Sequence, residues 1–91
     1  MFKIIETRKY IKDLQKIKLK LAQNVKLNIC VQALKNGFKL DKSARCKNLH
    51  GEWLGYSEIS IGWDLRVVFK CHEEQLELIR IGTHNKLFKK M

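Results

Sequence analysis

The sequence predicts an α+β fold in the order β-α-α-β-β-β, with a two-helix hairpin on one face of a mostly antiparallel, twisted sheet. Three observations predict it. Apolar residues recur at helical spacing through the first third of the chain, an Asn-Gly pair ends that pattern, and three segments of strand character follow. A chain of 91 residues has room for one core, so a single domain over residues 1–91 is expected.

The N-terminal part is predicted to hold a short strand and a first helix. Residues 2–6 are apolar and rich in β-branched side chains, and Thr7 behind them is a suitable helix cap. On the polar side of this helix, Asp13 is expected to pair with Lys9 or Lys16. The apolar stripe that predicts the helix consists of Tyr10, Leu14, Ile17 and Leu21.

A second helix is predicted after Asn24, which is interpreted as a break and a second cap. It should end at Asn36-Gly37, because glycine adopts the left-handed conformation at low cost. Residues 38–52 show no clear periodicity and are predicted to form an ordered basic loop that can include a helical turn. The prediction of the second helix is based on the apolar residues Val25, Ile29 and Ala33, flanked by Leu27, Cys30, Val31 and Leu34.

Three strands are predicted over residues 56–61, 65–70 and 76–81, with turns at 62–64 and 72–75. The third strand is apolar on both faces, which favours a position inside the sheet. Alternation in the first two strands places one set of side chains against the helices: Ile59, Ile61, Leu65, Val67 and Phe69. The opposite face is expected to be open and to present Glu58, Ser60, Asp64 and Arg66.

The net charge of +10 is distributed unevenly along the chain. Residues 1–47 hold 13 Lys and Arg against three acids, whereas residues 48–91 hold six against six. Such an excess attracts polyanions by counterion release and long-range steering. Nucleic acid, an acidic protein segment and an anionic membrane all satisfy that requirement, so charge alone defines only a class of partner.

The cysteines and the hydropathy pattern predict a cytoplasmic protein. Cys30, Cys46 and Cys71 are odd in number and lack metal-site spacing, so buried reduced thiols are expected and no metal site is predicted. No apolar run approaches the length that crosses a bilayer, and the first residues do not begin a signal peptide.

Two motifs carry a resemblance to a known family. The first runs from Leu49 to Tyr56 as Leu-His-Gly-Glu-Trp-Leu-Gly-Tyr, and the second from Arg80 to Phe88 as Arg-Ile-Gly-Thr-His-Asn-Lys-Leu-Phe. Together with residues 64–69 they resemble the RelE/ParE toxin superfamily, specifically its YafQ-like branch. The predicted order of elements agrees with that family throughout, and the ending is the most specific part.

The resemblance implies a toxin of a bacterial type II toxin–antitoxin system. Such a toxin would be a ribosome-dependent endoribonuclease, an mRNA interferase that cuts mRNA without a metal or other cofactor. The ribose 2′-hydroxyl would attack the adjacent phosphate, and this chemistry needs a base, cations for the phosphorane charge and an acid for the leaving oxygen. The implied partners are a cognate antitoxin, rRNA and mRNA.

Residue roles follow from the same resemblance. His84 resembles the general acid, Arg80 the arginine that stabilises the phosphorane, and Asp64 a candidate base. Arg66 would add a second phosphate contact, and Phe88 resembles the aromatic residue that packs on the substrate or the edge of the site. Family members often carry histidines where this chain has Lys47 and Ser60, and His50 could substitute for the first of them.

Two other functions stay open at this point. A ParE-like toxin would share the fold and poison DNA gyrase by binding, without nuclease chemistry. An inactive remnant would only bind an antitoxin. The Gly82-Thr83-His84 ending favours the nuclease, whereas the missing histidines favour the alternatives.

Overall fold

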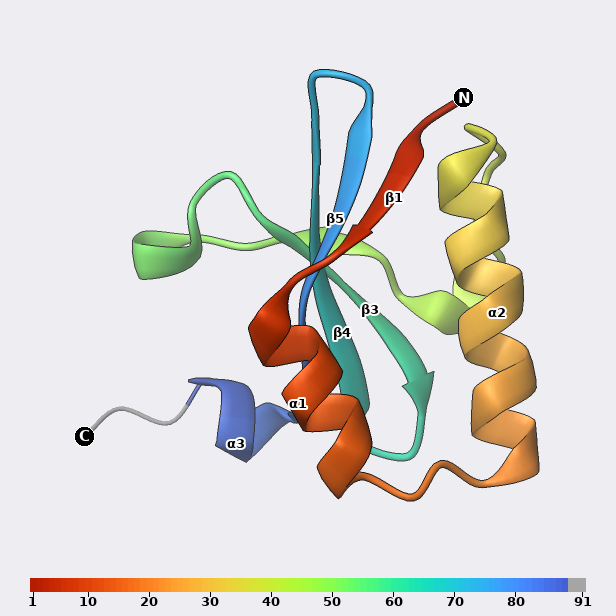
Figure 1. Cartoon of the computed structure of the whole chain (residues 1–91), viewed down its shortest axis with the longest axis vertical. Coiled ribbons are helices and arrows are strands. Elements are labelled where there is room, and N and C mark those ends of the chain that lie inside the picture. Colours follow the sequence, from red (N-terminus) through yellow and green to blue (C-terminus); the bar gives the residue numbers. More distant parts are fainter. Residues whose placement is uncertain (89–91) are drawn as a thin grey trace.

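A computed structural model describes residues 1–88. Five strands form one sheet in the order β1-β5-β4-β3-β2, so β5 lies inside the sheet as predicted (Figure 1). The elements, in chain order, are β1 (Lys3–Glu6), α1 (Arg8–Lys16), α2 (Leu21–Lys35), the 3-10 helix η1 (Lys42–Ala44), β2 (Lys47–Asn48), the 3-10 helix η2 (Gly51–Trp53), β3 (Ser57–Gly62), β4 (Leu65–His72), β5 (Gln75–Thr83) and α3 (His84–Phe88).

The sheet is mixed. β1 pairs with β5 in parallel, and the other neighbouring strands are antiparallel. Two residues separate Gly62 from Leu65 in the β3–β4 turn, where Asp64 has a φ of 50°. The sequence therefore predicted the α+β class and the mostly antiparallel sheet correctly.

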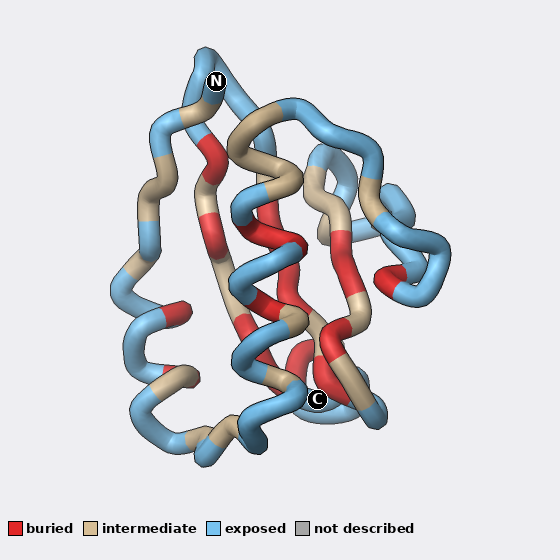
Figure 2. The backbone as a smooth tube through the Cα atoms, turned by 90° about the vertical axis from the view of Figure 1, so that its right-hand side faces the viewer, coloured by how far each residue is buried: buried red, intermediate tan, exposed pale blue. Residues whose placement is uncertain are grey.

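The two long helices cover one face of the sheet. α1 packs on β5, whereas α2 packs on β3, and Figure 2 shows α2 lying in front of buried strand segments. The side chains predicted to face the helices do so. The core consists of Tyr10, Leu27, Cys30, Val31, Ala44, Ile59, Ile61, Leu65, Val67, Phe69, Leu76, Leu78 and Ile81.

The opposite face is open only in part. Asp64 is exposed and Ser60 and Arg66 are half-buried, whereas the prediction is wrong for Glu58. In Figure 1, η2 and α3 lie on the side of the sheet away from α2. Val68 is fully buried there, and Glu58 is only 2% exposed although it was expected to face solvent. The reason is that residues 84–88 form a helix that returns over the sheet, and periodicity within the strands does not report this.

Helix boundaries differ from the predicted ones. α1 ends at Lys16 and α2 begins at Leu21, so Asn24 lies inside α2 and not at its cap. The start of α2 is set by Gln23, whose Oε1 accepts a hydrogen bond from the Lys20 N–H at 3.0 Å. The predicted Thr7 cap is correct, because its side chain accepts from the Tyr10 N–H.

The basic loop after α2 contains a helical turn, which the prediction allowed, and a short strand, which it did not. Its backbone forms η1, and two of its residues, Lys47 and Asn48, pair with β3 as the short strand β2. The end of α2 itself is as predicted, since Gly37 has a φ of 73° one residue after the Asn36 cap.

The predicted burial of the cysteines is right for one thiol and wrong for two. Cys30 is buried, whereas Cys46 and Cys71 are exposed, and all three are free.

Among residues 1–88, no helix has the length and hydropathy that crossing a membrane requires.

The edge of β5 is closed by α1. β1 ends at Glu6, opposite Leu78, so the rest of β5 has no strand on that side. Asp13 fills the gap: its Oδ2 accepts from the Ile81 N–H at 3.1 Å and from Arg80 Nε at 2.7 Å. Its Oδ1 accepts from Arg80 Nη2 at 3.1 Å. The prediction that Asp13 pairs with Lys9 or Lys16 is wrong. A two-point contact with a guanidinium and a hydrogen bond from a free strand amide are stronger than a contact with an exposed lysine.

This ion pair shifts both pKa values. Burial favours the neutral form of Asp13, but the hydrogen bonds from Arg80 and Ile81 outweigh it and hold the pKa of the carboxyl below its ordinary 3.8. The same contact raises the pKa of Arg80. Asp13 therefore stabilises the fold above its unfolded pKa, and the contribution is lost as pH falls through the lower folded value.

We expect Asp13→Asn to lower the free energy of unfolding at pH 7 by about 2 kcal/mol, less than for a fully buried pair because the Arg80 side chain is 24% exposed. Urea unfolding at pH 7 and pH 3 measures this. The wild type should lose more stability between the two pH values than the variant, whereas Glu52→Gln, an exposed acid, should behave like the wild type. Equal pH dependence of wild type and Asp13→Asn would contradict the assignment.

Candidate active site

A cavity of about 140 Å³ lies on the second face of the sheet, between β2, η2, β3 and α3. It gathers four of the predicted site residues: Lys47, His50, His84 and Phe88. The complete lining is Lys47, Leu49, His50, Trp53, Glu58, His84 and Phe88. Both motifs of the sequence analysis therefore meet at one place, although residues 57–79 separate them along the chain.

The C-terminal helix α3 is held against the sheet by a close approach. A Cβ on Gly82 would lie 3.3 Å from Leu87 Cδ2, so a glycine lets the buried Leu87 lie directly on β5. The Lys86 N–H donates to Thr83 Oγ1 at 3.3 Å in the first turn. Residue 84 is thereby fixed at the point where the strand becomes a helix.

Aromatic rings connect α3 to η2. The Trp53 and Phe88 rings meet edge to face at 5.7 Å, and Trp53 meets Tyr56 in the same way at 5.5 Å. The His84 ring lies 5.1 Å from Phe88. Such edge-to-face contacts fix ring orientation, so Phe88 positions both η2 and the histidine.

Glu58 is the electrostatic centre of the site. Its Oε1 accepts from Arg66 Nη1 at 3.1 Å and lies 3.4 Å from Lys47 Nζ. Its Oε2 and the Arg66 Nε are buried without a hydrogen-bond partner among the described residues. Glu58, Arg66 and Lys47 together carry a net positive charge, because one carboxylate lies between two cations. A buried carboxylate oxygen without a hydrogen-bond partner is uncommon.

Asp64 and Arg66 border a different cavity. Asp64 is exposed in the β3–β4 turn, and both residues line a space of about 570 Å³ next to the first one. Arg66 also contacts Glu58, which lines the smaller cavity, so the two spaces share this ion pair. The structure thus brings Arg66 to the rim of the site and leaves Asp64 outside it.

Arg80 is not among the residues that line either of these cavities. Its guanidinium uses Nε and Nη2 on Asp13, and Nη1 forms no hydrogen bond with a described residue. The pair forms because α1 brings the Asp13 carboxylate to the edge of β5. The predicted roles of Arg80 and His84 would place both at one phosphate, but of the two only His84 lines the smaller cavity.

Sequence reasoning missed Glu58 and Trp53 as parts of the site. Glu58 was placed on the correct face of β3, but the burial of that face depends on α3 and η2. Trp53 packs against Tyr56 and Phe88, and it also forms a wall of the cavity. No local signal in β3 marks Glu58, because its partners come from β2 and β4.

No group of three or more His, Cys, Asp or Glu side chains within residues 1–88 could hold a metal ion. The cavity instead combines a histidine, a carboxylate and cations, the groups that acid–base chemistry on an anionic substrate requires.

Solved structures of small bacterial toxins share this fold. A metal-bound toxin from Helicobacter pylori is 28% identical, with a TM-score of 0.84 over 97% of this chain and 100% of that one. The E. coli DinJ–YafQ toxin–antitoxin complex matches at 28% identity and a TM-score of 0.76, over 96% and 97% of the two chains. E. coli YafQ itself, at 24% identity, has a TM-score of 0.79 over 97% and 99%.

Fold and site together define a toxin of a type II toxin–antitoxin system. The model of the family described as "Bacterial toxin of type II toxin-antitoxin system, YafQ" matches residues 2–89. The chain belongs to this YafQ toxin family. No curated protein sequence matches the chain. The family predicted from the two motifs is confirmed.

We expect Leu87→Ala to release α3 and to disorder the site. Removing this buried side chain should lower the free energy of unfolding by about 2–3 kcal/mol and should abolish the hydrogen-exchange protection of the amides in α3. Exchange measured by NMR gives both quantities. Leu54→Ala, at a position 74% exposed, is the control and should change neither. Full protection of α3 in Leu87→Ala would show that Leu87 does not anchor it.

Proposed function

We propose that this toxin is a ribosome-dependent endoribonuclease, an mRNA interferase. The observation that carries the proposal is the single cavity in which His84 and Glu58 lie with Lys47, with Arg66 bound to the same carboxylate. An acid, a base and cations at one point are the groups needed to cleave RNA through its own 2′-hydroxyl. The cytoplasm, where ribosomes translate, is the proposed location.

The proposed reaction is an internal phosphoryl transfer. The 2′-oxygen attacks the adjacent phosphorus and loses its proton to a carboxylate, while the bond from phosphorus to the 5′-oxygen breaks. Protonated His84 donates its proton to that leaving oxygen. The products are a 2′,3′-cyclic phosphate and a 5′-hydroxyl, and Lys47 and Arg66 neutralise the charge on the phosphorane.

Two carboxylates are candidates for the base. Asp64 is suggested by resemblance, but it borders the neighbouring cavity. Glu58 shares the cavity with His84, and its Oε2 accepts no hydrogen bond from any of residues 1–88. Lys47, whose side chain is 62% exposed, covers Glu58 from the solvent side and would move towards a bound phosphate. We therefore propose Glu58 as the base, with Asp64 as the alternative.

The remaining residues would bind substrate. Phe88 and His50 line the cavity and offer an aromatic wall and a further hydrogen-bond donor. Arg80 would contribute through Nη1, the terminal nitrogen that Asp13 leaves free, as a longer-range positive charge.

We expect purified protein to cut mRNA on translating ribosomes, and His84→Ala and Glu58→Gln each to lower the rate by about 10²–10⁴-fold, the usual contribution of one acid or base. Primer extension on a defined message measures the cut. His72→Ala, an exposed histidine at the end of β4, is the matched control and should keep full activity.

Two results would contradict parts of this mechanism. A larger loss in Asp64→Asn than in Glu58→Gln would assign the base to Asp64. Intact mRNA with folded wild-type protein would remove the nuclease function, and a loss of DNA gyrase supercoiling in its presence would then support the ParE-like alternative.

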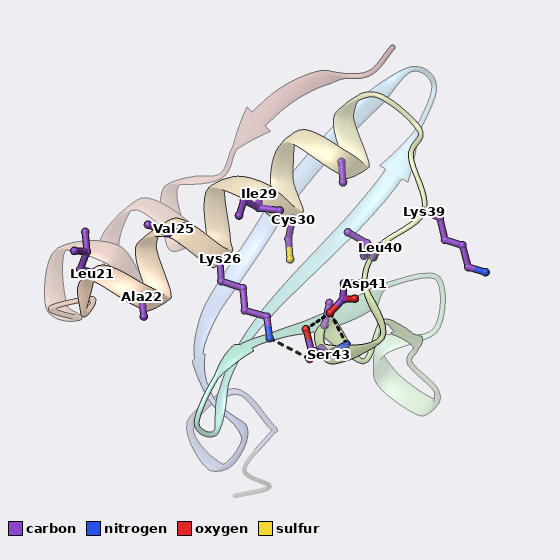
Figure 3. A pocket seen from close by; sticks show the side chains of 12 residues that line it. Leu21, Ala22, Val25, Lys26, Ile29, Cys30, Lys39, Leu40, Asp41 and Ser43 are labelled. Carbon is purple, nitrogen blue, oxygen red and sulfur yellow. Dashed lines mark hydrogen bonds between the residues drawn. The ribbon is translucent and has the colours of Figure 1, made fainter.

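We also propose where the antitoxin binds. An apolar groove of about 750 Å³ runs between α2 and η1, and Figure 3 shows the side chains that line it. Its α2 wall carries Leu21, Val25 and Ile29, which are 80%, 48% and 63% exposed and recur every four residues. Lys26 and Lys39 stand at its rim. An amphipathic, acidic antitoxin segment satisfies both the apolar stripe and the positive charge, and the solved complex of DinJ with YafQ supports an antitoxin as partner.

Ile29→Glu should weaken binding of the protein encoded next to the toxin gene by more than about tenfold, because it places a charge in the apolar groove. Isothermal titration calorimetry measures the affinity. Leu54→Glu introduces the same charge at another exposed apolar position and should have no effect. Equal affinities for wild type and Ile29→Glu would exclude this groove as the antitoxin site.

A further inference from the structure

The cavity beside the β3–β4 turn is larger than the site it adjoins and is not used by the proposed reaction. Its volume of about 570 Å³ falls within the range of roughly 300–1,000 Å³ that small-molecule sites occupy. It lies along the free edge of β3, because β2 pairs only with Ser57 and Glu58. The lining consists of Lys26, Ser43, Arg45, Ser60, Gly62, Trp63, Asp64 and Arg66.

The lining is strongly basic. Three cations, Lys26, Arg45 and Arg66, stand against the single carboxylate of Asp64. Lys26 is fixed in place, since its Nζ donates to the Ser43 carbonyl at 3.1 Å (Figure 3). The Arg66 Nε has no hydrogen-bond partner within the part of the chain that the structure describes. An anion that enters this space therefore meets cations from α2, η1 and β4, two of which are already oriented.

Trp63 adds an aromatic surface to these cations. Its side chain is 94% exposed at the tip of the turn, so the indole contributes little to the core. Tryptophan is usually largely buried, and its ring is enriched at binding interfaces. Aromatic rings next to basic side chains are the combination by which single-stranded nucleic acids are held, with bases stacked and phosphates paired.

We propose that this cavity is a nucleotide-binding subsite for single-stranded RNA, adjacent to the scissile bond. A base would stack on Trp63, and its phosphate would bind Arg45 and Lys26. The 140 Å³ cavity is too small for a whole nucleotide, so flanking nucleotides need a second space. Arg66 lies between the two cavities and would contact the phosphate that links them. This subsite rests on the proposed action on RNA and assigns the substrate contacts of that site.

Binding of a short RNA tests the subsite without requiring cleavage. A fluorescently labelled, 2′-O-methylated pentanucleotide cannot undergo 2′-hydroxyl attack, and its fluorescence anisotropy reports the dissociation constant. Trp63→Ala should weaken binding by roughly 5- to 150-fold, the range measured for loss of one base stack, and Trp63→Phe should restore part of it. Arg45→Ala should weaken binding and reduce the slope of log affinity against log salt by about one.

Two matched controls separate a built subsite from general charge and hydrophobicity. Phe38→Ala removes an aromatic side chain that is 69% exposed and lies outside this cavity. Arg8→Ala removes an exposed arginine at the start of α1. Both variants should bind the RNA as the wild type does.

Unchanged affinity in Trp63→Ala and Arg45→Ala, or equal losses in the two controls, would overturn the subsite. Loss of antitoxin affinity in Trp63→Ala with RNA binding intact would also overturn it, since the surface would then be a protein interface. Trp63-dependent RNA binding by a protein that cuts no mRNA would support the subsite and remove only the nuclease proposal.

Discussion

The close approach of α3 to the sheet is the constraint on which the site depends. Gly82 lacks a Cβ, and Leu87 Cδ2 packs so closely that it would lie only 3.3 Å from one. With Leu87 seated, His84 is held at the end of β5, and Phe88 reaches the Trp53 ring across the cavity. Residues 84–88 therefore cover part of the second face of the sheet, and the cavity lies between them and the strands.

Shielding this face changes the role of its charges. An exposed carboxylate on an edge of a sheet would exchange partners with water and contribute little. Glu58 is instead buried, and its ion pairs with Arg66 and Lys47 operate where water screens them less. The carboxylate contacts both cations and holds them beside the cavity. Charges that are fixed in place before the reaction stabilise the negative charge that develops on a phosphorane.

The fold was predictable because its determinants are local. Strand alternation in residues 57–70, the Thr7 cap and the Gly37 stop each depend on neighbours in sequence, and each is confirmed. The site was predictable only in part. His84, His50, Lys47 and Phe88 meet as the motifs imply, but Glu58 acquires its setting from β2, β4 and α3. The Asp13–Arg80 pair joins residues 67 apart in sequence, and no periodicity in α1 indicates it.

The uneven charge of the sequence also has a different meaning in three dimensions. A basic N-terminal half and a neutral C-terminal half would suggest one part that binds RNA and another that cuts it. The chain does not fold that way, because β2 and η1 carry the end of the basic half back to β3. Lys47 from that half pairs with Glu58, and Lys26 and Arg45 border the cavity that Arg66 shares. The N-terminal half thus supplies part of the positive charge, the C-terminal half supplies the histidine and the carboxylate, and neither half contains the site alone.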